Sequence, residues 1–528
     1  MNQLSHTSVR LTPTYASILP VVPIIGIGTL SLLEQVQNSL LLFWSFLGVA
    51  GILTIWAAAL FGYALRCRRH FTLEVALRRQ HYVQAGAQVL ILLYWGWYWS
   101  PVYESAYLIA VQLLFAYTFD VLLQWSRRDT YTLGFGPFPI VLSINLFFWF
   151  KPDWFYLQFL MVACGFAAKE LIRWNKAGHS VHIFNPSAFP LAVFSLGLMI
   201  TGGSDLTWGQ EIASTQFYPP HMFIVLFLLA LPNGLLFGVA SMTMSAVVTT
   251  YAFGLAYVSV TGVYYFYDTY VPIAVFLGMN FLFTDPSTSP RTQLGRIMFG
   301  VCYGLSTVAL YGILGSMGIP TFYDKLIPVP ILNLVIQFLD RAANLAMFRR
   351  IKFVVLGHTR WSLSRNLSYV SIWGISFMGI SAAHGVGDSH PGQWIPFWQK
   401  ACEDDRPHAC SYLADMHANF CENDSGWACN ELGVLLTQRD GNHIGATGSF
   451  TRGCDLRFSV ACANSKRLFQ IGEEPQREGP TLRDLPVVLR GSKGPVVERS
   501  PKGLYLLACE RGWVNMCTET AAKSNPSG

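Results

Sequence analysis

Cysteines near the C-terminal end carry the most regular chemical spacing in the chain. Of the 11 cysteines, eight form pairs with the same spacing, C-x7-C: Cys402 and Cys410, Cys421 and Cys429, Cys454 and Cys462, and Cys509 and Cys517. Eight residues along one straight helix would separate the Cα atoms by about 12 Å, beyond the roughly 7 Å that a disulfide tolerates. The chain must therefore turn within each pair, as in an antiparallel helix hairpin, if the sulfurs are to meet. A metal site is the alternative chemistry, but identical pairs without a C-x2-C motif do not favour it, and we expect no metal.

A second set of polar residues lies within apolar sequence. Asn185, Asn280 and Asn333 must find hydrogen-bond partners there, either between helices or on a ligand. Asp285, which precedes Pro286, is expected to cap a turn or to pair with Arg296. Asp120, Glu104 and Asp268 are further candidates for handling protons or cations, because buried charge is costly.

The composition of the chain indicates that most of it lies in a membrane. The chain has 528 residues, of which 52% are hydrophobic and only 12% charged, whereas soluble domains carry roughly a quarter charged residues. The net charge of +6 comes largely from Arg and Lys between apolar blocks. It therefore indicates topology, with lipid as the surrounding partner, rather than affinity for nucleic acid.

The apolar blocks predict a polytopic all-α membrane protein with about thirteen spans, since roughly 20 residues cross a bilayer as a helix. The blocks at 137–150 and 326–340 are short and flanked by proline, which is typical of broken or re-entrant helices. Basic clusters follow the even-numbered spans. This pattern predicts a bacterial inner-membrane protein whose N-terminus is cytoplasmic and whose cysteine-rich tail is periplasmic, where disulfides form.

One string within the apolar region is specific enough to resemble a known family. Thr284-Asp285-Pro286 continues through Ser289-Pro290 and Thr292 to Gly295-Arg296, and Asn333-Leu334 leads to Asp340. With Asn185-Pro186, these motifs resemble the RnfD/NqrB family, the integral membrane subunits of ion-pumping respiratory complexes, over about residues 82–340. The resemblance implies ten helices in two inverted five-helix repeats, a plan shared with urea-channel-like proteins. It also implies a subunit of a redox-linked membrane complex rather than a stand-alone catalyst.

The same resemblance implies a flavin, FMN or riboflavin. Redox members of the family esterify FMN to a threonine of an S/T-G-A-T-like motif in the outer loop after the fifth core span. Here that loop, about 202–219, lacks the motif, and Thr207 is the candidate attachment point. The resemblance assigns Asn185, Asn280, Asp285 and Asn333 to a noncovalent cofactor site.

The tail resembles the cysteine-rich Sel-one-like repeats, in which short helix hairpins are each pinned by one disulfide. Ala428-Cys429-Asn430-Glu431-Leu432-Gly433 is the closest match, and the resemblance covers about 395–470 and, weakly, 503–520. It implies disulfides within the four C-x7-C pairs and a surface that docks a periplasmic protein or another subunit.

The expected organisation has six parts: extra N-terminal membrane helices (1–81), the RnfD/NqrB-like core (82–340), a cytoplasmic basic loop with the last membrane helix (341–390), a periplasmic Sel-one-like domain (391–470), a linker (471–502) and a last C-x7-C hairpin with its tail (503–528). The expected function is a membrane component of an electron-transfer or ion/solute transport system. The alternatives are a urea-channel-like small-solute transporter without redox activity and a membrane anchor or accessory protein of a biosynthetic or assembly system.

Overall fold

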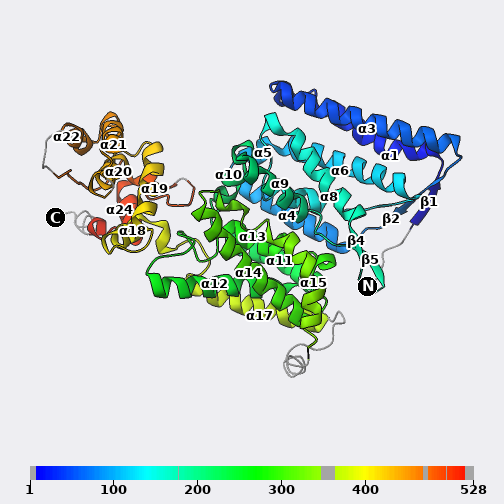
Figure 1. Cartoon of the computed structure of the whole chain (residues 1–528). Coiled ribbons are helices and arrows are strands. Elements are labelled where there is room, and N and C mark those ends of the chain that lie inside the picture. The colour runs from blue at the N-terminus through cyan, green and yellow to red at the C-terminus, as the bar shows by residue number, and fades with distance from the viewer. Residues whose placement is uncertain are drawn as a thin grey trace, which may run out of the picture. The chain divides into compact units, whose positions relative to one another are not determined.

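The computed structural model describes residues 7–176, 178–345, 363–439, 441–467, 474–494 and 496–517, which fall into two compact units (Figure 1). Unit 1 is made of Met1–Gln216, His221–Thr250 and Ile273–Gly379. Unit 2 is made of Phe217–Pro220, Tyr251–Pro272 and Ile380–Gly528. Most of the predicted basic loop, at 346–362, lies outside the described residues.

Unit 1 opens with two long apolar helices and a small sheet. Helices α1 (Pro13–Leu30) and α3 (Leu40–Arg66), joined through the short α2 (Glu34–Gln37), lie side by side (Figure 1). The Ser39 hydroxyl caps α3 by accepting from the Leu42 N–H at 3.3 Å. Strand β2 (Phe71–Val75) pairs antiparallel with β1 (Thr7–Leu11) and parallel with β3 (Thr130–Leu133). The sheets are small additions that the all-α prediction did not contain.

Ten further helices follow in two sets of five, whose second helices have 22 residues each and whose third helices have nine residues each. The first set is α4 (Arg79–Tyr98), α6 (Ala106–Arg127), α7 (Pro137–Asn145), α8 (Tyr156–Leu171) and α9 (Ala188–Thr201), with the short α5 (Pro101–Glu104) and α10 (Gly209–Thr215) at its connections. The second set is α11 (Met222–Phe237), α12 (Ala240–Thr261), α13 (Ile273–Phe281), α14 (Gln293–Ser316) and α15 (Pro328–Ala342). The third helix of each set, α7 or α13, has nine residues. Helix α17 (Leu363–Ala382) follows the second set.

Short 3-10 turns and a strand pair complete unit 1. The 3-10 turn η1 (Pro152–Trp154) lies between α7 and α8, and η3 (Pro286–Thr288) lies at the corresponding place between α13 and α14. Two more, η2 (Ser204–Leu206) and η4 (Thr321–Tyr323), lie after α9 and before α15. Strands β4 (Arg173–Lys176) and β5 (His179–His182) pair antiparallel between α8 and α9, and Gly178 in their turn has a φ of 82°.

Six helical segments within the described residues are long and apolar enough to cross a membrane, as a multi-pass membrane protein requires: Pro13–Leu30, Leu40–Arg66, Ala106–Arg127, Ala240–Thr261, Gln293–Ser316 and Thr321–Ala342. The count of thirteen spans stays a prediction. Nine residues of helix extend only about 14 Å, so the helices α7 and α13 by themselves cover about half of the roughly 30 Å of hydrocarbon. Every residue of α13 is buried, as a helix that ends inside protein requires.

Unit 2 contains successive short helices that are joined by disulfides. Its 3-10 turn η6 (Pro391–Gln393) leads into α18 (Ile395–Glu403), α19 (Ala409–Glu422), α20 (Gly426–Gln438), α21 (His443–Asp455) and α22 (Ser459–Arg467), and α23 (Leu485–Val488) and α24 (Pro501–Glu510) follow. The four predicted disulfides are present, with Cα–Cα distances of 4.6, 4.7, 4.5 and 4.9 Å in chain order. The structure therefore confirms that the chain turns inside each C-x7-C pair.

The turns share one backbone feature. The third residue after the first cysteine of each pair has a positive φ: Asp405 (52°), Asp424 (67°), Arg457 (64°) and Gly512 (93°). A left-handed residue just past a helix end is the usual way for a helix to stop and reverse. The common φ explains how four different sequences close the same eight-residue loop.

The segment expected to be a linker is packed where the structure describes it. Leu485, Val488 and Leu489 are buried in the same apolar core as Trp398 and Phe420. Asp484 fixes this segment to the start of α20, because its carboxylate accepts from the Ser425 hydroxyl at 2.8 Å and the Trp427 N–H at 3.1 Å. Residues 474–494 therefore belong to the folded unit rather than to a spacer.

Candidate functional site

Two of the predicted site residues, Asn185 and Asn333, meet in unit 1. The Asn185 backbone N–H donates to Asn333 Oδ1 at 3.0 Å, and Asn185 Nδ2 donates to the Leu282 carbonyl at 2.7 Å. Asn333 Nδ2 donates to the Thr288 carbonyl at 3.0 Å. Both side chains are buried, and their amides are already used on the protein itself. We call Asn185 and Asn333 the asparagine junction; it joins the start of α9, the α13–α14 connection and α15.

Asp285 lies beside this junction. It caps η3, which was one of the two roles expected from the sequence. Its Oδ1 accepts from the Ser287 N–H at 2.9 Å, and its Oδ2 lies 3.3 Å from His182 Nε2 on β5. Burial alone would raise the pKa of Asp285, but the hydrogen bond and charge of His182, with the Ser287 N–H and the Thr288 hydroxyl, hold this pKa below its usual range. The side chain that contacts the Asp285 carboxylate from β5 is thus that of His182.

The rest of the string from Thr284 to Arg296 is held by hydrogen bonds to neighbouring helices and to its own main chain. The Thr292 hydroxyl caps α14 by accepting from the Gly295 N–H at 3.1 Å. Asp340 on α15 accepts from the Arg291 and Thr292 N–H groups, each at 3.0 Å. Arg296, the other expected partner of Asp285, instead donates to the Pro290 carbonyl at 3.0 Å and to the Gly238 carbonyl. The expected Asp285–Arg296 pair is therefore replaced by contacts to main-chain oxygens.

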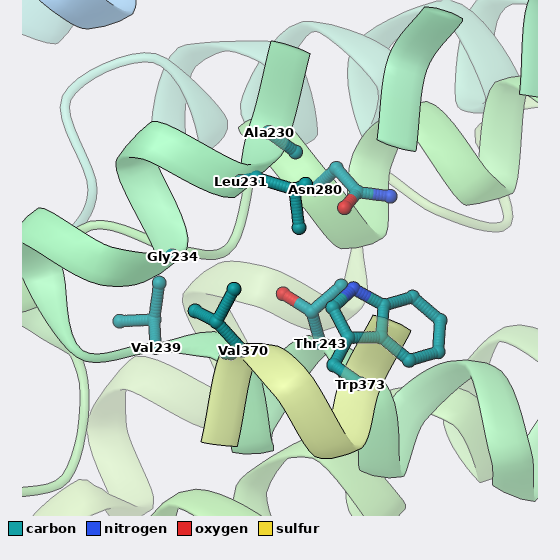
Figure 2. Close-up of a pocket in the computed structure, with 9 residues that line it drawn as sticks. Ala230, Leu231, Gly234, Val239, Thr243, Asn280, Val370 and Trp373 are labelled. Atoms are coloured by element: carbon teal, nitrogen blue, oxygen red, sulfur yellow. The ribbon is translucent and has the colours of Figure 1, made fainter. Parts of the chain in front are cut away.

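Asn280 lies apart from the junction, at a small cavity. Its Nδ2 donates to the Phe276 carbonyl of its own helix at 2.8 Å. Figure 2 shows its side chain on one side of the cavity, with Thr243 and Trp373 on the other side. The cavity volume is about 10 Å³, which is room for about one water molecule.

Thr207, the candidate attachment point, is buried in the loop after α9. Its hydroxyl donates to the Ser204 carbonyl at 3.0 Å and accepts from the Gly209 N–H at 3.3 Å, and only 3% of the residue is exposed. Thr207 pairs with Phe150 in an isolated β-bridge. The hydroxyl therefore has protein partners on both sides, and esterification would require this loop to open.

The structure also reveals a network of buried amides that the sequence analysis missed. Gln112 and Asn145 exchange two side-chain hydrogen bonds of 3.0 and 2.9 Å, and Gln158 Nε2 donates to Gln112 Oε1 at 2.9 Å. The Gln158 Oε1 accepts from the Phe150 N–H at 3.1 Å. The network ties α6, α7 and α8 together. Its sequence signal is an amide residue in the interior of each of three successive apolar blocks.

A second missed feature is a buried ion pair before α15. Asp324 and Lys325 are 2% and 3% exposed, and Lys325 Nζ lies 3.5 Å from Asp324 Oδ1 and donates to the Phe322 carbonyl at 2.7 Å. Tyr303 donates from its hydroxyl to the Lys325 carbonyl at 2.9 Å. The sequence signal for this pair is two adjacent residues of opposite charge between two apolar blocks.

Two charged residues that the sequence analysis proposed for handling protons or cations have partners within the protein. Asp120 accepts a hydrogen bond from Gln124 Nε2, and Glu104 accepts one from the Ser100 hydroxyl.

The chain matches no protein-family model, no curated protein and no solved structure.

Proposed function

We propose that the chain is the membrane component of an electron-transfer or ion/solute transport system, with an RnfD/NqrB-like core of two inverted five-helix repeats. The observation that carries the proposal is the matched order of the helices from α4 to α15. Each set places a nine-residue helix third, and each nine-residue helix is followed by a 3-10 turn that starts with proline. Interrupted helices in corresponding positions of two halves are typical of transporters.

Contacts between the sets support a two-fold relation. The first helices of the two sets, α4 and α11, pack against each other, and so do the last helices, α9 and α15. A two-fold axis makes equivalent elements contact each other in this way. The asparagine junction lies at the second of these contacts, since Asn185 precedes α9 and Asn333 lies on α15.

A flavin, FMN or riboflavin, is the ligand that separates the redox function from plain transport. The test is the absorbance and fluorescence spectrum of detergent-purified protein before and after acid precipitation. Flavin in the supernatant supports a noncovalent redox subunit, and flavin in the precipitate supports covalent attachment. In the covalent case Thr207→Val must remove the precipitated flavin, whereas Thr201→Val, at an exposed threonine at the end of α9, must not.

A small-solute transporter without redox activity is the second candidate. The engaged Thr207 hydroxyl and the water-sized cavity at Asn280 favour it over a bound flavin. A colourless protein that mediates solute flux in proteoliposomes would select this candidate. For both candidate functions, we propose that the tail docks a periplasmic protein or another subunit. We also propose that the protein lies in a bacterial inner membrane with its tail in the periplasm.

A further inference from the structure

An extended segment of unit 2, residues 474–480, is held along α20 and α22 through its main chain. Asn464 on α22 uses both ends of its amide on one residue: Nδ2 donates to the Gln476 carbonyl at 2.8 Å, and Oδ1 accepts from the Gln476 N–H at 2.7 Å. Asn430 on α20 donates to the same carbonyl at 3.2 Å. Two side chains thus recognise the backbone of a single residue.

Two further contacts extend this recognition. Trp427 Nε1 donates to the Glu478 carbonyl at 2.8 Å, and Arg477 Nε lies 3.5 Å from Glu431 Oε2. We call Trp427, Asn430, Glu431 and Asn464 the Asn430–Asn464 site. Its four residues are 3%, 0%, 7% and 1% exposed, respectively. These side chains are therefore closed off from solvent while the segment lies against them.

Most hydrogen bonds to the segment use its main chain, while the Gln476 amide faces the Arg467 guanidinium and Arg477 donates to Gln438 Oε1 at 3.5 Å. Gln476, Arg477 and Glu478 offer main-chain groups and one cation to the helices. Every extended peptide carries the same main-chain groups, as in peptide recognition by strand addition. The exception is the charge: burial raises the pKa of Glu431, and Arg477 opposes this rise, so the site also favours a cation beside Glu431.

Replacing the segment by another extended chain costs less free energy than leaving the site empty. An empty site would leave the Asn430 and Asn464 amides without their main-chain partners, which destabilises the folded tail because buried polar groups need hydrogen bonds. Another extended chain would restore the same hydrogen bonds. The helices need no new ordering in this exchange, because Asn464 Nδ2 also donates to Asn430 Oδ1 at 2.8 Å and so orients both amides.

We propose that the Asn430–Asn464 site binds an extended segment of a partner protein that carries an Arg or Lys, and that residues 474–480 are an intrachain occupant which the partner displaces. This inference rests on the proposed docking role of the tail and names the partner chemistry. It makes residues 474–480 an autoinhibitory segment of the docking surface.

The test is a titration of full-length detergent-purified protein with a fluorescein-labelled peptide of residues 474–481, read by fluorescence anisotropy. Gln476→Pro removes the N–H that Asn464 accepts and frees the site. Glu478→Pro is the matched control, because Glu478 offers Trp427 its carbonyl, which proline retains. We expect Gln476→Pro to bind the peptide at least about tenfold more tightly than the wild type or Glu478→Pro, and Asn464→Ala added to Gln476→Pro to abolish binding.

Equal binding by the wild type and Gln476→Pro, or binding that survives Asn464→Ala, overturns the proposal. Thermal unfolding and a count of three free thiols verify that each variant is folded, since eight of the 11 cysteines are paired. If Gln476→Pro does not yield folded protein, Arg477→Glu, which loses the contact to Glu431, must raise peptide affinity about threefold. The titration measures peptide binding by the tail, whereas the flavin spectrum tests the function of the core. Failure of the peptide-site proposal and failure of the proposed function can therefore be told apart.

Discussion

The Asn185 N–H donates to the side-chain oxygen of Asn333 across 148 positions of sequence, at 3.0 Å. Removing this side chain with Asn333→Ala would leave two buried main-chain groups, the Asn185 N–H and the Thr288 carbonyl, without a partner. We expect a loss of about 2–4 kcal/mol in the free energy of unfolding, measured by thermal unfolding in detergent. Leu334→Ala is the control, because Leu334 lies on the same helix and is 55% exposed. A loss no larger than that of the control would show that the asparagine junction does not stabilise unit 1.

For the buried Asp324–Lys325 pair, we expect a single substitution to lower stability and a second substitution to restore most of it. Lys325→Met would leave the Asp324 carboxylate buried without its cation, and we expect a loss of about 3–5 kcal/mol. Adding Asp324→Leu should restore most of the lost stability, because two apolar residues replace a pair whose desolvation is costly. Both variants are compared by thermal unfolding in the same detergent. A double variant as unstable as the single one would mean that the hydrogen bond to the Phe322 carbonyl matters more than the charge.

The left-handed turn residues predict stabilising substitutions. Arg457 is exposed, and its φ of 64° suits glycine. Arg457→Gly should raise the free energy of unfolding by about 0.5–1 kcal/mol, because the penalty for a side chain at this φ exceeds the added entropy of glycine. Arg457→Ala is the control: it keeps the Cβ atom that disfavours this φ and removes the rest of the side chain, so we expect the free energy of unfolding to stay unchanged. Gly512→Ala should act in the opposite direction by about 1 kcal/mol, and calorimetry of the full-length protein reads all three variants.

His417 makes the tail sensitive to acid. Burial, with a smaller contribution from the charge of Arg477, lowers the pKa of His417 from its ordinary value of 6.5 to about 3. Between these two values the unfolded chain binds more protons than the folded chain, so stability falls as the pH falls. The expected loss between about pH 7 and pH 5 is about 2 kcal/mol. His417→Gln should remove this share of the acid sensitivity, whereas His443→Gln, at an exposed position, should not; thermal unfolding at both pH values measures the difference.

Patterns in the sequence predicted the paired cysteines because the spacing itself limits the geometry. They also predicted apolar helices, because hydropathy reports the burial that a membrane demands. They could not predict where α13 ends, since Leu282 and Phe283 are as apolar as the helix before them and continue as buried irregular chain. Residues 474–494 were assigned to a linker because their polar composition hides main-chain bonding to Asn430 and Asn464, which no residue pattern displays. The Asp285–His182 pair depends on the β4–β5 turn, whose position only tertiary structure fixes.

The eight-residue spacing of the disulfides has a consequence for proteolysis. A protease that enters a C-x7-C turn, for example between the exposed residues Asn423 and Asp424, would cut the backbone inside the loop closed by Cys421 and Cys429. The two fragments would stay covalently joined and would migrate as one species until a reductant separated them. The exposed turns of the tail could thus be nicked in a protease-rich compartment without releasing the helices that they connect.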